Sequence, residues 1–141
     1  MFRFKLVAPS GTKFDADVHE VILPTLDGEI GVLSEHMPLV SVVTTGAIVV
    51  RHNEKENDYN RDFFATTGGV IEVSDNTLRV LVDEADHADS INVAEAKAAL
   101  ERAHKLKAEA KDQISLNKAQ ALVDRHNVRL KVANLRRRHQ K

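Results

Sequence analysis

The sequence predicts an all-β domain, a sandwich or a barrel, followed by two helices that form an antiparallel hairpin. Short segments in which apolar and polar residues alternate recur as far as Val82, with turn residues between them. Beyond Asp83 this alternation stops, and apolar residues recur at helical spacing in an alanine-rich stretch. A chain of 141 residues is long enough for one small domain with an appendage.

The expected strands are short and are separated by Gly, Pro, Asn and Asp residues, which favour turns. They cover residues 2–6, 14–18, 21–23, 28–33, 39–43, 47–51, 61–66, 70–73 and 77–82, and the last of these is expected to be the final strand. The polar run 53–58 is expected to be a solvated hairpin loop. Gly68 and Gly69 indicate a close backbone approach or a bulge.

Residues 28–39 are the most strongly punctuated part of the β region. Two glycines flank Glu29 and its neighbour, and a turn with His36 and Pro38 follows. Because Gly permits backbone angles closed to other residues and Pro fixes φ, this pattern predicts a strand, a tight turn and a second strand. A loop His next to Pro is more often a surface contact than a general base. Glu29 has no second carboxylate or nucleophile near it in the sequence.

Charge is unevenly distributed along the chain, although the formal net charge is only −1. Residues 1–92 carry 7 Lys/Arg against 16 Asp/Glu, a net charge of −9, whereas residues 118–141 carry 8 against 1, a net charge of +7. An acidic body with a basic tail implies either a partner for the tail or a fold-back of the tail onto the body.

The region after Asp83 begins with an acidic segment, residues 84–90, which is expected to be a linker or an irregular connection. Asn92 followed three residues later by Glu95 has the form of a capping box and predicts the start of a helix. Ala and Leu residues recur at helical spacing as far as Ile114, so a corner is expected at residues 115–117 and a second helix at about 118–137.

The second helix is predicted to have two apolar faces with a basic stripe between them. A helix that packs only on its hairpin partner needs one apolar face. The second face therefore predicts burial against the β domain or another chain, unless its small residues merely fill space. One face holds Ala119, Leu122, Val123, Leu130 and Ala133, the other holds Ala121, Val128, Val132 and Leu135, and the stripe holds Lys118, Arg125, Arg129 and Arg136.

Signatures of catalytic and metal sites are absent from the sequence. It contains no Cys, no Walker A sequence, no Gly-x-Ser-x-Gly elbow and no His-x-x-x-His pair. No apolar run approaches the roughly 18 residues of a membrane span, and the first residues lack the apolar core of a signal peptide. The sequence therefore indicates a part of an enzyme complex rather than an enzyme, with no catalytic residue and no metal ligand.

Three motifs, in this order, resemble the epsilon subunit of F-type ATP synthases. They are Gly28-Glu29-Ile30-Gly31-Val32-Leu33 with the following His36-x-Pro38-Leu39, then Thr67-Gly68-Gly69-Val70-Ile71-Glu72-Val73, then Val80-Leu81-Val82-Asp83. The resemblance covers nearly the whole chain. It implies a ten-stranded β-sandwich domain, residues 1–86, and a regulatory helical hairpin, residues 87–141.

The resemblance also implies a non-catalytic rotor subunit of a proton-translocating ATP synthase, at the cytoplasmic face of the bacterial inner membrane and without a membrane span of its own. The sandwich would contact the gamma subunit and the ring of c subunits, with Glu29 and His36 in the turn region that faces the ring. The helices would lie folded on the sandwich, or extend into the catalytic head of alpha and beta subunits and inhibit ATP hydrolysis. In the extended state the basic stripe, Lys118, Arg125, Arg129 and Arg136, would meet an acidic segment of the beta subunit.

Some members of this family bind ATP on the hairpin, and this sequence keeps the corresponding motif only in part. The family's Ile/Leu-Asp-x-x-Arg-Ala is matched by Ile91-Asn92-Val93-Ala94-Glu95-Ala96, so Asn92 replaces an Asp and Glu95 replaces an Arg. The later arginines are matched by Arg102, Arg125 and Arg129. Because Glu95 places an anion where phosphate would bind, ATP is expected to be at most a weak regulatory ligand. No other cofactor is expected.

The alternative function is a nucleic-acid-binding protein with a basic helical tail. Its phosphate contacts would come from the basic stripe and from Arg136-Arg137-Arg138. Two features weigh against it, since the body is acidic and aromatic residues, which stack on bases, make up only 4% of the chain.

Overall fold

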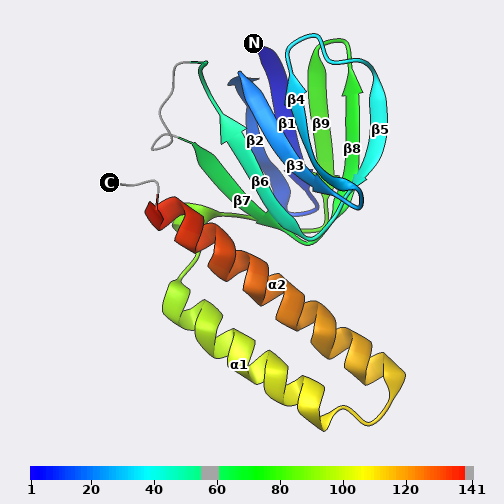
Figure 1. Ribbon diagram of the computed structural model, residues 1–141, viewed down its shortest axis with the longest axis vertical. Helices are drawn as coiled ribbons and strands as arrows, with labels where there is room; N and C mark the ends of the chain where they lie inside the picture. The colour runs from blue at the N-terminus through cyan, green and yellow to red at the C-terminus, as the bar shows by residue number, and fades with distance from the viewer. Residues whose placement is uncertain (55–60, 139–141) are drawn as a thin grey trace.

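The structure, a computed structural model, describes residues 1–54 and 61–138. A β-sandwich lies at one end of the molecule, and two helices project from its lower edge (Figure 1). The predicted β-sandwich followed by an antiparallel helical hairpin is therefore confirmed. The expected loop at residues 53–58 lies mostly outside the described residues.

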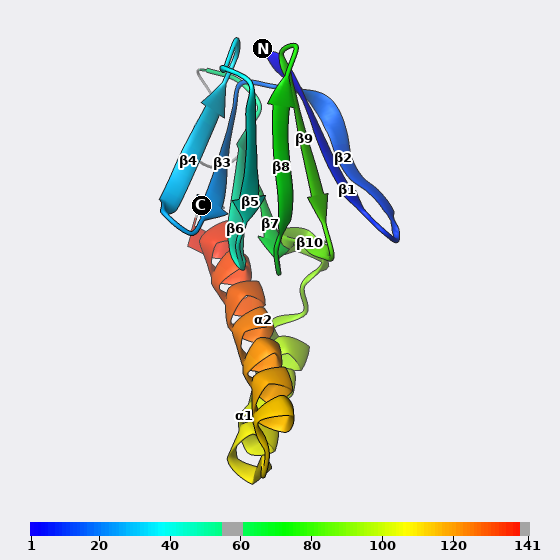
Figure 2. The same ribbon diagram turned by 90° about the vertical axis from the view of Figure 1, so that its right-hand side faces the viewer.

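Ten strands of the described chain form two five-stranded sheets that pack face to face (Figure 2). One sheet has the order β2-β1-β9-β8-β5 and consists of β1 (Phe2–Ala8), β2 (Gly11–Val18), β5 (Leu39–Val43), β8 (Gly69–Ser74) and β9 (Thr77–Val82). The other has the order β10-β7-β6-β3-β4 and consists of β3 (Glu20–Thr25), β4 (Gly28–Leu33), β6 (Gly46–Arg51), β7 (Asp62–Thr66) and β10 (Ala85–His87). Only β1 and β9 pair in parallel; the other recorded pairs are antiparallel.

The core of the sandwich follows from the alternation in the strands. In β1, Phe4 and Leu6 point between the sheets and are fully buried, while Arg3 and Lys5 point outward. Each such buried side chain contributes roughly 1.5–3 kcal/mol to folding. The same pattern in the other strands adds the fully buried large residues Leu23, Ile48, Ile71 and Leu78.

The two glycines at residues 68 and 69 mark a close backbone approach, as predicted. A Cβ atom on Gly69 would overlap the carbonyl oxygen of Leu81 and would lie 2.8 Å from the Cα atom of Val82. Gly68 has a φ of +134°, a region that only glycine adopts readily. This pair of residues therefore lets the start of β8 approach the end of β9 closely.

The acidic segment 84–90 is not the linker or irregular connection that the sequence predicted, because most of it has regular structure. It contains β10, which pairs with β7, and the 3₁₀ turn η2 (Ala88–Ser90). Ala85 and Ala88 are each 5% exposed, so the segment is anchored by its two small apolar residues and covers the edge of β7. The prediction of residues 77–82 as the last strand is also wrong, and the expected domain boundary at residue 86 falls inside β10.

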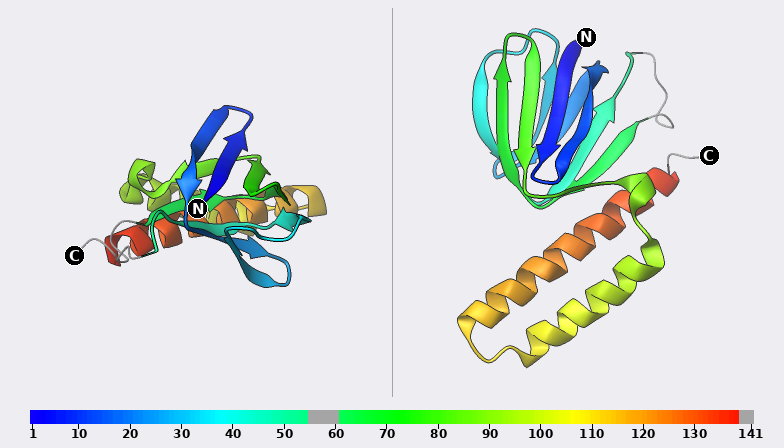
Figure 3. Two further views of the ribbon diagram at one scale, coloured as in Figure 1. Left: turned by 90° about the horizontal axis from the view of Figure 1, so that it is seen from above. Right: turned by 180° about the vertical axis from the view of Figure 1, so that it is seen from behind.

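The helices of the hairpin are α1 (Val93–Glu109) and α2 (Gln113–Arg138), which lie antiparallel and side by side (Figure 3). The predicted cap is confirmed, because the side-chain oxygen of Asn92 accepts the backbone N–H of Glu95 at 3.0 Å. The predicted corner at residues 115–117 is wrong. Asp112 accepts the N–H of Ser115 at 2.6 Å, and α2 starts at Gln113, five residues earlier than the sequence suggested. The hydrogen bonds from Ser115 lower the pKa of Asp112.

Candidate functional site

The second half of α2 packs between the sandwich and α1. Val132 is fully buried and Ala133 is 5% exposed, in an apolar cluster to which both the sandwich and α1 contribute. We call this cluster the hairpin interface; its buried members are Phe63, Ala65, Ala88, Ile91, Ala96, Val132 and Ala133. Of the two surfaces that the sequence allowed for the second apolar face of α2, the β domain is the one observed.

The surface for α2 comes mainly from β7, a strand that is buried on both faces. Phe64 points into the sandwich core, whereas Phe63 and Ala65 point to the opposite side and belong to the hairpin interface. A strand that reads as a continuous apolar run is typical of this double burial. The position of the hairpin is therefore fixed by the outer face of one strand.

Three of the four stripe residues form ion pairs with the acidic segment before the hairpin. The guanidinium of Arg125 lies 2.9 Å from Glu84, that of Arg129 lies 3.3 Å from Asp86, and that of Arg136 lies 2.9 Å from Asp89. The three arginine side chains are 20–33% exposed. The fold-back of the basic tail onto the acidic body, one of the two options from the charge pattern, is therefore observed.

Lys118, the fourth residue of the predicted stripe, is separate from the other three. It lies near the start of α2 and its side chain is exposed. The start of α2 belongs to the part of the hairpin that extends beyond the sandwich (Figures 1 and 2). Within the described part of the chain it has no ion-pair partner. The stripe thus consists of a paired part near the sandwich and an unpaired part at the far end.

His126 is a buried residue of the hairpin that the sequence analysis missed. It is 9% exposed, and its Nδ1 atom has no hydrogen-bond partner among the described residues. Burial lowers its pKa below the ordinary value of 6.5, and the charges of Arg125, Arg129 and Arg102 lower it further, whereas Glu84 acts in the opposite direction. The available signal was its spacing, three residues after Val123 and four before Leu130, on the apolar face.

A second polar cluster links the sandwich to the acidic segment. The carboxylate of Asp62 at the start of β7 accepts hydrogen bonds from the Nε2 atoms of His52, at 2.5 Å, and His87, at 2.6 Å. The Nδ1 atom of His87 in turn accepts the backbone N–H of Asp89 at 3.1 Å. This cluster could not be predicted from sequence, because its members are separated by 10 and 25 residues. Its effect is to hold the turn that presents Asp89 to α2.

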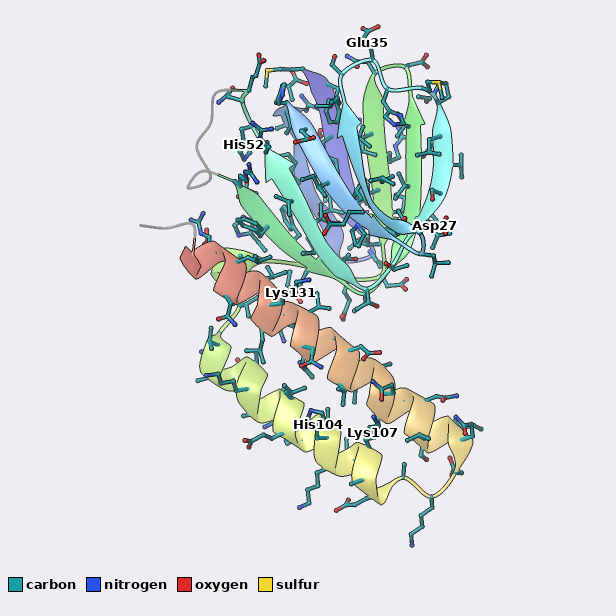
Figure 4. All side chains as sticks on the ribbon, viewed as in Figure 1. Asp27, Glu35, His52, His104, Lys107 and Lys131 are labelled. Carbon is teal, nitrogen blue, oxygen red and sulfur yellow. The ribbon has the colours of Figure 1, made fainter. Side chains whose placement is uncertain are left out.

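The residues predicted to face a ring, Glu29 and His36, are not brought together. Glu29 lies at the start of β4 and His36 lies in the turn after its end, so the length of an edge strand, roughly 20 Å for six residues, separates them. Figure 4 shows this separation through their labelled neighbours Asp27 and Glu35, which lie at opposite ends of the sandwich. Any one surface that contacts both residues must therefore run along the edge formed by β4.

The turn that contains His36 is held in a defined shape. Glu35 has a φ of 65°, which is uncommon for a residue with a side chain. Its backbone N–H donates to the side-chain oxygen of Asn76 at 2.8 Å, and the amide nitrogen of Asn76 donates to the carbonyl of Met1 at 3.1 Å. His36 Nδ1 lies 2.7 Å from the carbonyl of Met37, so this nitrogen carries the proton.

Comparison with known proteins identifies the family of this chain. The sequence profile described as "ATP synthase, Delta/Epsilon chain, beta-sandwich domain" matches residues 1–88. The ATP synthase epsilon chain of Gloeobacter violaceus is 35% identical over 93% of this chain and 96% of its own length. That of Staphylococcus epidermidis is 35% identical over 94% of this chain and 96% of its own length. The chain belongs to the ATP synthase epsilon-chain family.

Solved structures share the fold of this epsilon chain at lower sequence identity. A chain in the structure of the Euglena gracilis mitochondrial ATP synthase, with OSCP, F1 and c-ring, has a TM-score of 0.77 and 20% identity, covering 93% of this chain and 79% of that chain. A chain of the central stalk and c-ring of the Tetrahymena thermophila mitochondrial ATP synthase has a TM-score of 0.60 and 16% identity, covering 93% of this chain and 95% of that chain. The resemblance found in the sequence motifs is thus confirmed, and the nucleic-acid-binding alternative has no support.

The residues of the degenerate ATP motif have other roles in this epsilon chain. Ile91 is part of the hairpin interface, Asn92 caps α1, and Glu95 is exposed on the first turn of that helix. Arg125 and Arg129, which would have to meet phosphate, are already paired with carboxylates. The remaining residue of the motif is Arg102, which is exposed on α1. Together with Arg125 and Arg129 it lowers the pKa of His126.

The part of this epsilon chain that the structure describes shows neither a metal-binding cluster nor a membrane-spanning helix. No group of three or more His, Cys, Asp or Glu residues there is arranged to hold a metal ion. No helix there combines the length and the apolar character needed to cross a membrane.

Proposed function

We propose that this epsilon chain is a rotor subunit in the central stalk of a proton-translocating F-type ATP synthase, and that its hairpin inhibits ATP hydrolysis. In this proposal the sandwich contacts the gamma subunit and the ring of c subunits. The hairpin lies on the sandwich in one state and extends into the head of alpha and beta subunits in the other. The complex sits at the cytoplasmic face of a bacterial inner membrane, to which the chain is peripheral. Membership of the family supports this role.

The observation that carries the proposal is the weak attachment of the hairpin to the sandwich. The buried members of the hairpin interface include only one aromatic side chain, Phe63, and most of the others are Ala and Val. The buried residues of α1 are only Ala96 and Ala103. Small side chains bury little apolar surface, and partly exposed ion pairs contribute at most about 1 kcal/mol each. A contact of this kind allows two states that differ by a few kcal/mol.

In this proposal the two parts of the chain have different roles. Residues 1–86 form the stalk-binding domain, and residues 87–141 form the regulatory domain. The hairpin extends well beyond the sandwich even in the folded state (Figure 2), so a surface for a second partner is present. At its far end Leu106 and Ile114 are 52% and 70% exposed, together with Lys118. ATP acts at most as a weak regulatory ligand, because two of the arginines it needs are engaged by carboxylates.

The contact with the c ring is tested by crosslinking at the two ends of β4. Glu29→Cys and His36→Cys are introduced separately, together with Cys in the polar loop of c. If the edge at β4 lies along the ring, both positions crosslink to c. Crosslinking of only one would place the ring at that end of the sandwich. Crosslinking of both to beta subunits alone would contradict the assignment.

The inhibitory role is tested by removal of the hairpin in the assembled complex. A chain that ends after Ile91 keeps all ten strands and η2. We expect a complex with this chain to assemble and to hydrolyse ATP faster than the complex with the full chain. Unchanged hydrolysis in a correctly assembled complex would refute the inhibitory role while leaving the stalk role intact.

A further inference from the structure

The acidic segment before the hairpin matches the basic stripe of α2 in spacing. Arg125 and Arg129 are four residues apart, which is about 6 Å along a helix. Their partners Glu84 and Asp86 are two residues apart, which is about 6.6 Å along a strand. The two distances are nearly equal, so one carboxylate faces each guanidinium; these contacts are ion pairs by distance, 2.9 and 3.3 Å, and the two Nε atoms make no hydrogen bond of good geometry.

The third pair is made through the turn η2. Arg136 lies seven residues beyond Arg129, about 10.5 Å along the helix. Its partner Asp89 lies three residues beyond Asp86, within η2, and its carboxylate is 2.9 Å from the guanidinium of Arg136. Three carboxylates of residues 84–89, the acidic row, therefore each face one guanidinium group of α2.

The carboxylates are held in place by the sandwich and not by α2. Asp86 is fixed because β10 pairs with β7, where it lies opposite Ala65. Asp89 is fixed by the hydrogen bond from its backbone N–H to His87, which is in turn bound to Asp62. The acidic row is thus a preformed surface on which the stripe of α2 docks.

We infer that this acidic row is an internal competitor for the arginines that bind an acidic partner when the hairpin extends. The inference rests on the proposed function, in which that partner is the catalytic head. Each arginine pairs with one row at a time, so a stronger internal contact means weaker inhibition. The partner chemistry follows from the spacing: a row of carboxylates about 6 and 10 Å apart, which a helix provides at positions i, i+4 and i+11.

The arginines and the carboxylates of these ion pairs can be replaced separately, and the two replacements have different expected effects on inhibition. Replacement of the arginines removes the internal contact and the contact with the partner together. Loss of the first favours inhibition and loss of the second weakens it, so the two effects partly cancel. Replacement of the carboxylates removes the internal contact alone. Replacing the three carboxylates by neutral amides should therefore release the hairpin and increase inhibition, although no residue of the inhibitory surface has changed.

The main experiment uses the full chain with the acidic row neutralised. The variant carries Glu84→Gln, Asp86→Asn and Asp89→Asn; the matched control carries Asp27→Asn, Glu101→Gln and Glu109→Gln, which change the net charge equally at acids without a recorded ion pair. Amide hydrogen exchange of residues 125–136 in the isolated chain reports docking. Because the pairs are partly exposed, we expect about a twofold effect for each and about an eightfold increase in exchange for all three. The control should exchange like the unmodified chain.

The same two variants are then assembled into the complex and tested for ATP hydrolysis. The neutralised row should lower hydrolysis severalfold relative to the control. Faster exchange in the isolated chain without lower hydrolysis would overturn the competition. Unchanged exchange would overturn the internal contact itself. Failure of the proposed function is recognised separately, because the chain that ends after Ile91 would then not relieve inhibition.

A charge swap at one pair gives an independent test. Asp86→Arg combined with Arg129→Asp keeps an internal ion pair in which the two charges have changed places. An acidic partner of the extended hairpin then meets a carboxylate at residue 129 and is repelled. The swapped chain should retain most of the protection of α2 in the isolated state and should inhibit hydrolysis less. Strong inhibition by the swapped chain would overturn the claim that Arg129 serves both contacts.

Discussion

Replacement of Val132 by Ala should loosen the hairpin without unfolding the sandwich. Val132 is fully buried in the hairpin interface, so the substitution deletes two buried carbon atoms. At about 0.8 kcal/mol for each carbon, with an added cost for the cavity, we expect a loss of about 2 kcal/mol from docking. That loss is comparable to the sum of the three partly exposed ion pairs, each of at most about 1 kcal/mol.

The measurement is amide hydrogen exchange of α2 followed alongside the thermal transition of the sandwich. Exchange of α2 should accelerate about thirtyfold, the factor that corresponds to about 2 kcal/mol, and the main transition should stay within a few degrees. Ile114→Ala is the matched control, because it deletes a larger side chain that is 70% exposed and should change neither quantity much. If Val132→Ala lowers the stability of the strands and of α2 equally, the hairpin and the sandwich are one cooperative unit and the two-state reasoning fails.

Three further predictions concern single sites. Burial and nearby arginines lower the pKa of His126 in the folded chain, so its contribution to stability is complete above pH 6.5 and is lost as the pH falls from there towards the folded-state pKa. The protection of α2 relative to the intrinsic exchange rate at each pH should therefore fall between pH 7.5 and 5.5, and His126→Leu should remove this dependence. Gly69→Ala should destabilise the sandwich by about 3 kcal/mol in thermal unfolding, because its Cβ overlaps backbone, whereas a control at Gly31, where only the end of a Glu side chain is near, should have little effect; equal effects would refute the close-approach argument. Asn92→Asp with Glu95→Arg should tighten ATP binding in calorimetry, and tight binding by the unmodified chain would contradict the account of a degenerate motif.

The strands of the sandwich were largely predictable because their order is local. The alternation of apolar and polar residues in β1 predicts which side chains face inward. The glycine and proline turns around β4 predict where that strand ends. The missed strand, β10, has only three residues, and its pairing with β7 depends on a partner about 20 positions earlier. Such a segment carries too few residues for a period to be recognised.

Most parts of the site that sequence analysis missed depend on contacts between distant segments. The two apolar faces of α2 and the fold-back of its arginines follow from periodicity and charge, but the identity of their partners, such as Asp89 for Arg136, requires the fold. Likewise, Asp62 meets His52 and His87 only when β6, β7 and β10 are side by side. The turn at Asp112 was missed because the helical period of α1 continues without interruption into α2.

The most direct test of the central claim is to lock the hairpin on the sandwich. Ala65 of β7 and Val128 of α2 line the same crevice and belong to the same apolar cluster, and the chain contains no Cys, so Ala65→Cys with Val128→Cys gives one engineered pair in an otherwise thiol-free subunit. In the assembled complex the oxidised, locked chain should allow fast ATP hydrolysis, and reduction of the disulfide should restore inhibition. Equal hydrolysis in the oxidised and reduced states, with the disulfide verified by mass, would contradict the claim that the hairpin must leave the sandwich to inhibit.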